Sequence, residues 1–145
     1  MKTVSVTKRI RVPVQVAWDV IRTGAHMDRW VPAITRCEVE GSGVGARRVC
    51  VVDDHEMHES IETVDDPSRL FQYRIQRQAM LPVRNVLGTL HLAACGAEET
   101  EVLWFVNFDL DDEAAWAPVR DGIEAIYRAG IDGLEAYARR ETIPS

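Results

Sequence analysis

The stretch that decides the fold is residues 113–140, EAAWAPVRDGIEAIYRAGIDGLEAYARR, near the end of the chain. Its apolar side chains recur at intervals that place them on one face of a helix. They are Val119, Ile123, Ile126, Ile131, Leu134 and Tyr137. This pattern predicts one long amphipathic helix whose apolar face packs against the rest of the protein.

Gly122, Gly130 and Gly133 lie on or beside that apolar face. Each glycine costs a helix interior roughly 1 kcal/mol relative to alanine. We therefore expect each to permit a close approach of another backbone or to leave space. We expect Gly122 to preserve the volume of a cavity between the helix and the preceding strands, and Gly130 and Gly133 to allow close contact with the sheet.

Turn residues divide the preceding sequence into short apolar–polar alternating segments. Strands are predicted at residues 4–12, 35–40, 46–52, 56–64, 70–77, 83–93 and 100–110, and short helices at residues 16–24 and 26–34. Turns this frequent favour an antiparallel meander over parallel strands with crossover helices. We predict an α+β helix-grip fold, in which a seven-stranded curved antiparallel sheet wraps around the long C-terminal helix and two short helices follow the first strand.

Length and composition are those of one globular domain. The chain has 145 residues, and 17 basic against 23 acidic side chains give a net charge of −6, which argues against a nucleic-acid partner. No apolar run is long enough for stable membrane insertion, and the first residues lack the apolar block of a signal peptide. We expect a single domain over residues 1–140 with a short tail at 141–145, as a monomer or homodimer. Three cysteines without a CxxC pair favour reduced thiols and a cytoplasmic location.

Four stretches of the sequence resemble a known family. They are residues 10–18 (IRVPVQVAW), 30–34 (WVPAI) with 37–40 (CEVE), 44–48 (VGARR), and 58–66 (HESIETVDD) with Arg69 and 73–75 (YRI). They are similar to segments of the START-related (SRPBCC) superfamily, which includes polyketide cyclases, birch-pollen-type allergens and the plant abscisic acid receptors. The resemblance runs from about residue 3 to residue 137, and it implies a helix-grip fold with an internal ligand cavity.

The sequence departs from the hormone receptors where they bind their ligand. Val31 stands in place of the lysine that holds the hormone carboxylate. Residues 52–56 (VDDHE) replace the Ser-Gly-Leu-Pro-Ala gating loop, and residues 80–83 (MLPV) replace the His-Arg-Leu latch. The resemblance therefore implies the cavity and not the hormone as its occupant.

Strand alternation assigns the walls of this cavity, since every second side chain of a strand points to the same face. The inward set is Arg48, Cys50, Val52, Met57, Glu59, Ile61, Tyr73, Ile75, Val86, Gly88, Leu90, Val102, Trp104, Val106 and Phe108. Val119, Gly122, Ile123, Ile126 and Tyr127 complete it from the helix, and the resemblance adds Val31, Leu81 and Val83. These residues are predicted to bind a small hydrophobic ligand, because mainly apolar walls with few polar groups are typical of small-molecule sites.

Arg48 and Glu59 are the charged exceptions among these inward positions. On neighbouring strands they would pair, since either charge alone would be costly to bury. The pair could serve only to satisfy itself, or it could anchor a hydroxyl, carbonyl or carboxylate of a ligand. A register displaced by one residue would instead send both side chains to the surface.

Three functions are compatible with such a cavity. The first is binding or transport of a lipid, isoprenoid, or aromatic or polyketide metabolite. The second is a cyclase, aromatase or dehydratase reaction with Glu59 as base and Tyr73 or Tyr127 as acid. The third is an interaction module with a vestigial cavity. His26, His55, His58 and His91 show no metal-binding spacing, and neither a metal nor an organic cofactor is expected.

Overall fold

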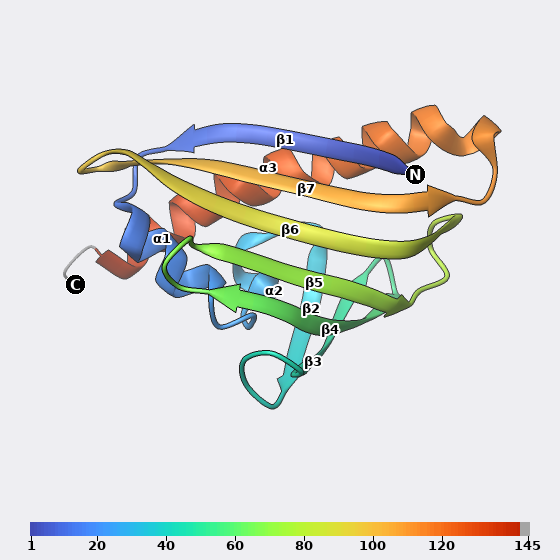
Figure 1. Ribbon diagram of the computed structural model, residues 1–145, viewed down its shortest axis with the longest axis horizontal. Coiled ribbons are helices and arrows are strands. Elements are labelled where there is room, and N and C mark those ends of the chain that lie inside the picture. The colour runs from blue at the N-terminus through green and yellow to red at the C-terminus, as the bar shows by residue number, and fades with distance from the viewer. Residues whose placement is uncertain (143–145) are drawn as a thin grey trace.

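The computed structural model describes residues 1–142 and consists of a single antiparallel sheet, two short helices and one long helix (Figure 1). The strands are β1 (Lys2–Ile10), β2 (Ile34–Glu40), β3 (Arg47–Val52), β4 (His55–Asp65), β5 (Leu70–Arg77), β6 (Val83–Gly96) and β7 (Glu99–Leu110). The helices are α1 (Val14–Ile21), α2 (Met27–Trp30), a 3₁₀ turn η1 (Glu113–Ala115) and α3 (Trp116–Thr142). This order confirms the predicted α+β helix-grip fold.

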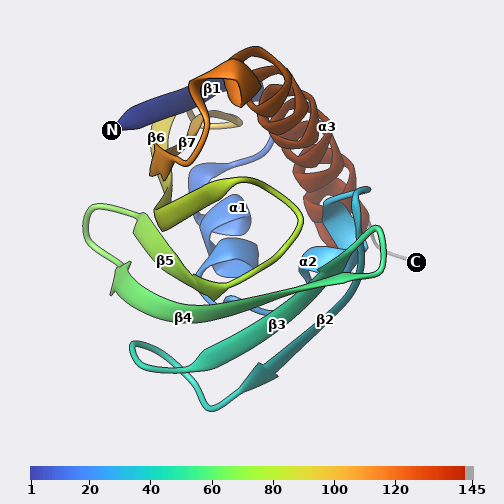
Figure 2. The same cartoon turned by 90° about the vertical axis from the view of Figure 1, so that its right-hand side faces the viewer.

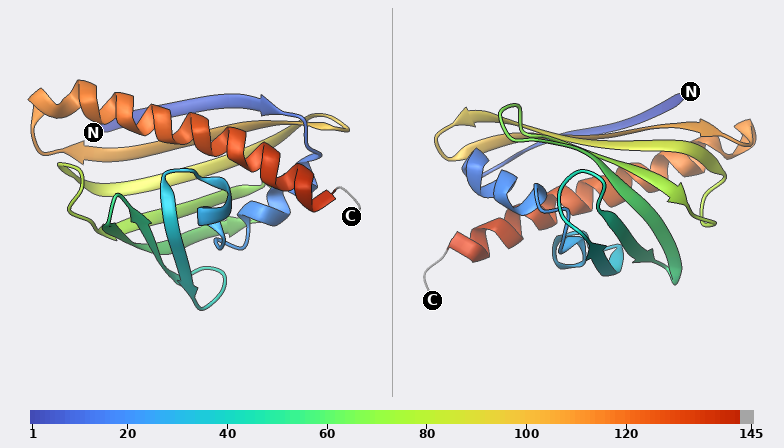
Figure 3. Two further views of the ribbon diagram at one scale, coloured as in Figure 1. Left: turned by 180° about the vertical axis from the view of Figure 1, so that it is seen from behind. Right: turned by 60° about the horizontal axis from the view of Figure 1, so that its bottom comes forward.

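The sheet has seven strands in the order β1-β7-β6-β5-β4-β3-β2, and all neighbours are antiparallel. It curls so far that β2 and β3 lie opposite β1 and β7, with α3 on the open side (Figure 2). Seen from behind, α3 runs diagonally across the concave face of the sheet (Figure 3). A curved sheet with one apolar face and a single long helix to cover it makes an enclosed space possible between the two.

Alternation along the strands produces the apolar concave face. In β7, Val102, Trp104, Val106 and Phe108 are all buried, and the residues between them are at least partly exposed. In β4, Met57, Glu59 and Ile61 are buried whereas His58 and Ser60 are only half-buried, as the predicted register requires. The register is therefore the one that carries both charged residues inward.

The C-terminal half of α3 packs tightly. A Cβ on Gly133 would lie 1.8 Å from the carbonyl oxygen of Trp30 in α2, and one on Gly130 would lie 2.8 Å from Cζ3 of Trp104. The prediction of close contact is confirmed for both residues, but Gly133 meets the backbone of α2 rather than the sheet. Ile131, Leu134 and Ala138 on the same helix are fully buried.

Element boundaries differ in small ways from the prediction. The second short helix is a single turn, because the chain is already extended at Val31 and Pro32 follows. The long helix begins at Trp116, after η1, and continues to Thr142 rather than ending at Arg140. Of the tail expected at residues 141–145, residues 143–145 lie outside the described residues, and 141 and 142 belong to α3. No helix within residues 1–142 is long and apolar enough to cross a membrane.

Candidate functional site

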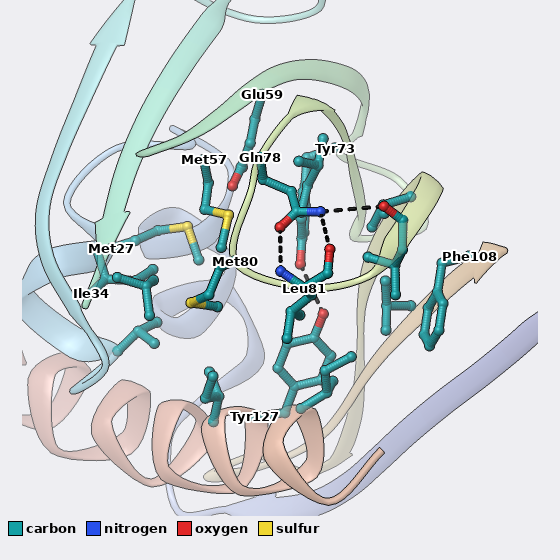
Figure 4. A pocket seen from close by; sticks show the side chains of 18 of the residues that line it. Met27, Ile34, Met57, Glu59, Tyr73, Gln78, Met80, Leu81, Phe108 and Tyr127 are labelled. Carbon is teal, nitrogen blue, oxygen red and sulfur yellow. Dashed lines mark hydrogen bonds between the residues drawn. The ribbon is translucent and has the colours of Figure 1, made fainter. Parts of the chain in front are cut away.

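A cavity of about 110 Å³ lies between the concave face of the sheet and the N-terminal half of α3 (Figure 4). Its walls are mainly aliphatic, aromatic and thioether side chains. The lining residues are Met27, Val31, Ile34, Arg48, Val52, Met57, Glu59, Tyr73, Ile75, Gln78, Met80, Leu81, Val83, Val86, Trp104, Val106, Phe108, Ile123, Ile126 and Tyr127. An apolar cavity of about 150 Å³ holds benzene in another protein, so this somewhat smaller space is of the order of a single ring.

Most of the residues predicted to line the cavity border it. They are Val31, Arg48, Val52, Met57, Glu59, Tyr73, Ile75, Leu81, Val83, Val86, Trp104, Val106, Phe108, Ile123, Ile126 and Tyr127. They come from six elements and two loops that lie far apart in the sequence. The register deduced from alternation is what brings them together; their role in binding a ligand stays a prediction.

Gly122 does not border the cavity, which corrects the expectation that it preserves volume there. It is exposed on α3, and a Cβ built on it would have no atom within 4 Å. The helix turns Ile123 and Tyr127 inward, whereas Gly122, one turn before Ile126, lies at the exposed edge of that face and not on the cavity wall.

Six other predicted lining residues are buried behind the wall, among them Leu90 and Val102, which belong to the core. Val119 and Ile61 belong to the core without bordering the cavity, and Ile61 packs against Gly24. Cys50 points its sulfur at Cys37, with an Sγ–Sγ distance of 3.2 Å. Gly88 is covered by a tyrosine ring, since a Cβ there would lie 2.1 Å from Cζ of Tyr73. Gly88 thus contributes indirectly, because only a residue without a side chain lets Tyr73 lie flat against β6.

The predicted pair of Arg48 and Glu59 forms one polar cluster of the cavity. The two residues are directly opposite each other on β3 and β4, and are 2% and 7% exposed. Both Nε and Nη2 of Arg48 donate to Oε1 of Glu59, at 2.9 and 2.5 Å, and Nη1 donates to the carbonyl of Gly24 at 2.9 Å. Gly24 has a φ of 71°, which favours glycine, and its carbonyl is thereby turned toward the guanidinium.

Tyr73, Trp104 and Tyr127 form the second polar cluster. The hydroxyls of Tyr73 and Tyr127 are 3.1 Å apart, and Nε1 of Trp104 donates to the Tyr73 hydroxyl at 3.1 Å. The rings of Trp104 and Tyr127 stack with centroids 3.9 Å apart. Both tyrosine hydroxyls are therefore positioned by neighbours from the sheet and the helix (Figure 4).

Burial sets the protonation states of these groups. It raises the pKa of Tyr73 to about 12, with the negative charge of Glu59 adding to the effect. Burial, followed by the neighbouring Tyr73, raises the pKa of Tyr127 well above its usual value. Burial alone would lower the pKa of Arg48, but Glu59 outweighs it and the net pKa is raised. At neutral pH the cavity therefore presents neutral phenols and a charged guanidinium.

The loop between β5 and β6 closes one side of the cavity, and it was not fully predicted. The Gln78 side chain donates from Nε2 to the carbonyls of Leu81 and Val83, at 2.8 and 3.3 Å, and accepts from the Leu81 amide at 2.8 Å. This clamp holds Met80 and Leu81 against the cavity (Figure 4). Gln78, Met80 and Met27 were missed as lining residues, because loop and helix-end positions carry no alternation from which to place them. Ile34 was missed because it was assigned to the second short helix, whereas it is the first residue of β2.

Metal coordination finds no support in the side chains described. Within residues 1–142, no three His, Cys, Asp or Glu side chains lie close enough together to hold a metal ion. The chemistry available to the cavity is hydrogen bonding by Glu59 and the tyrosine hydroxyls, and apolar contact with the rest of the wall.

Solved structures with this fold come from bacteria and plants. The protein XoxI from Bacillus cereus has 20% identity and a TM-score of 0.85, and the match covers 99% of this chain and 100% of that one. Major latex-like protein 151 from Panax ginseng has 17% identity and a TM-score of 0.80, with 94% and 97% covered. Norcoclaurine synthase from Thalictrum flavum, in complex with dopamine and hydroxybenzaldehyde, has 15% identity and a TM-score of 0.78, with 99% and 89% covered. Such low identities establish similarity of fold only.

Sequence comparison gives the family. A search of curated proteins finds no match. The family model described as "Polyketide cyclase / dehydrase and lipid transport" matches residues 1–139, nearly the whole chain. The protein therefore belongs to the polyketide cyclase/dehydrase and lipid transport family of the START-related (SRPBCC) superfamily.

Proposed function

We propose that this protein binds a small hydrophobic molecule in the cavity between its sheet and α3. The observation that carries the proposal is the wall itself, in which apolar side chains surround the few polar groups of the Arg48 and Tyr73 clusters. A site that is mostly apolar with a small number of positioned polar groups is typical for small ligands. The size of the cavity favours a single-ring or similarly compact molecule over a long lipid chain.

Binding of a small apolar molecule, measured by NMR, tests the proposal directly. We expect p-xylene to bind the ¹⁵N-labelled protein and to shift amide signals of residues that line the cavity. Ile126→Trp would place an indole in the cavity and should weaken binding by about tenfold or more, because ring and probe would occupy the same space. Gly122→Ala, at an exposed position of the same helix, is the matched control and should bind as the wild type does.

Equal binding by Ile126→Trp and the wild type would overturn the proposal, since the probe would then lie elsewhere. Native mass spectrometry of the gently purified protein can afterwards identify the natural occupant. A cytoplasmic location, the absence of a nucleic-acid partner and a monomeric or dimeric state stay predictions.

An enzymatic function is the second candidate, and one observation favours it. Glu59 and the hydroxyls of Tyr73 and Tyr127 border the same cavity, so that a ligand could meet a base and a proton donor together. Against this, Oε1 of Glu59 already accepts two hydrogen bonds from Arg48, which engages one oxygen of the proposed base. Turnover of a polyketide-type ketone that is lost in Glu59→Gln would favour the enzyme, whereas binding without turnover would favour the carrier.

A further inference from the structure

Only one of the two carboxylate oxygens of Glu59 accepts hydrogen bonds from the described residues. Its Oε1 accepts both hydrogen bonds from Arg48, while Oε2 has no hydrogen-bonding partner among residues 1–142. Oε2 is not among the fully buried, unpartnered side-chain atoms. The carboxylate borders the cavity, so Oε2 is an acceptor that a ligand can reach. An ionised oxygen left without a partner in an apolar site is costly, and a ligand that donates to it relieves that cost.

One hydroxyl hydrogen of the Tyr73–Tyr127 pair is not used in a hydrogen bond between the described side chains. The Tyr73 oxygen already accepts from Nε1 of Trp104, and a single hydrogen bond joins the hydroxyls of Tyr73 and Tyr127. Each hydroxyl carries one hydrogen. Whichever tyrosine donates to the other, the second O–H hydrogen has no partner among the described side chains. Both tyrosines line the cavity, so a ligand there can approach this hydrogen.

Arg48 is less accessible than Glu59 and the tyrosines. Three of its five N–H hydrogens are donated to protein oxygens, two to Glu59 and one to Gly24, and its side chain is only 1% exposed. The rings of Phe71 and Tyr73 lie 5.7 and 5.0 Å from its central carbon and cover it further. The positive charge is therefore engaged by Glu59, and the polar surface offered to a ligand is a carboxylate acceptor and a phenol donor.

We infer that the cavity selects an apolar ligand whose polar group is an un-ionised hydroxyl, as in a phenol or an alcohol, and that it discriminates against carboxylic acids. A hydroxyl donates one hydrogen bond and accepts others, which matches the spare acceptor of Glu59 and the spare donor of the tyrosine pair. The inference rests on the proposed function and names the class of its ligand.

Other polar groups fit less well. A carboxylate would bring a second negative charge next to Glu59 in a site of low dielectric. An ammonium group has no lone pair, so it cannot accept a hydrogen bond from the tyrosine hydroxyl. A pure hydrocarbon would displace water from Oε2 of Glu59 without replacing its hydrogen bond.

A matched series of probes tests the inference. The series is 4-methylphenol, 4-methylbenzoate and p-xylene, which share one ring and differ in one group. NMR titration at neutral pH gives the three dissociation constants. We expect 4-methylphenol to bind at least about tenfold more tightly than 4-methylbenzoate. It should also bind no more weakly than p-xylene, although a cavity indifferent to the hydroxyl would favour the hydrocarbon.

Two variants identify the groups responsible. Glu59→Gln removes the negative charge beside Arg48, so the preference for 4-methylphenol over 4-methylbenzoate should fall by about tenfold or more. Replacing both Tyr73 and Tyr127 by phenylalanine should weaken 4-methylphenol several-fold relative to p-xylene. The p-xylene constant in each variant shows whether the cavity is intact, and Gly122→Ala should leave every ratio unchanged.

The outcomes separate the inference from the proposed function. If all three probes bind and p-xylene is the tightest, with the benzoate equal to the phenol, the inference is wrong and a general apolar cavity stands. If no probe binds, the proposed function fails and the inference with it. If a variant does not fold, the wild-type series alone decides.

Discussion

The two halves of α3 meet the rest of the protein in opposite ways. Around Gly130 and Gly133 the helix has no side chain between it and its neighbours, and Trp104 and the backbone of Trp30 fill the space. Around Ile123 and Tyr127 the helix borders the cavity, and only long side chains such as Tyr127, which stacks on Trp104, reach the sheet. One helix thus closes one end of the curved sheet and leaves the other open. The lesson is that the two glycines in close contact with other elements lie in the closed half, whereas Gly122 in the open half touches nothing.

The cavity next to the open half of α3 also contains the buried ion pair of Arg48 and Glu59. Removing one of these charges should have the largest effect on stability. Arg48→Met would leave the buried Glu59 carboxyl group without its partner, and should lower the free energy of unfolding by about 3–5 kcal/mol. Urea denaturation measures the change. Arg48→Met combined with Glu59→Leu should recover most of the loss, because an apolar pair needs no compensation. A single variant as stable as the wild type would show that the ion pair is not part of what holds this half.

Gly133→Ala tests the close contact between α3 and α2 in the closed half. Helix propensity alone favours alanine by about 1 kcal/mol, but its Cβ would lie 1.8 Å from the Trp30 carbonyl oxygen. We expect a net loss of about 1–3 kcal/mol, because α2 must move away from α3. Thermal and urea unfolding show whether the variant is less or more stable than the wild type. A stabilised variant would mean that the two helices are not in contact.

Alkaline pH should weaken the open half through its tyrosines. The folded-state pKa of Tyr73 is raised to about 12, above the value of about 10 expected for an unfolded chain. The neutral phenol therefore contributes stability that is complete below about pH 10 and is lost as the pH rises through about 12. Urea midpoints measured across this window should fall, and they should fall less in Tyr73→Phe. The same decline in the variant would assign the effect to other groups.

The smallest effect is expected at the exposed glycine of the open half. Gly122→Ala adds a methyl group where nothing lies within 4 Å, so it should stabilise the protein by about 1 kcal/mol through helix propensity. Probe binding should not change. Weakened p-xylene binding in this variant would place Gly122 at the cavity wall after all.

Periodicity predicted nearly all of the fold and the wall positions that lie in regular elements. Alternation in β4 placed Met57 and Glu59 inward, and the partner of Glu59 followed from the neighbouring strand. It could not predict Gln78 or Met80, whose positions depend on a loop conformation fixed by a side-chain clamp. It failed at Gly122, because glycine has no side chain whose polarity shows which helix face it occupies.

The same limit explains the residues that face inward without reaching the cavity. Alternation gives the face of a strand but not the depth of the side chains above it, so Gly88 could not be distinguished from an open wall position. The ring of Tyr73 covers it. Likewise, the contact between Cys37 and Cys50 depends on a register that the sequence alone does not determine.

A crystal structure of the protein with 4-methylphenol tests the central claim most directly. The account predicts the ring between the sheet and the open half of α3, with its hydroxyl within hydrogen-bond distance of Oε2 of Glu59 and of a hydroxyl of the tyrosine pair. A ring bound outside this cavity, or inside it with the hydroxyl turned toward the apolar wall, would contradict the account.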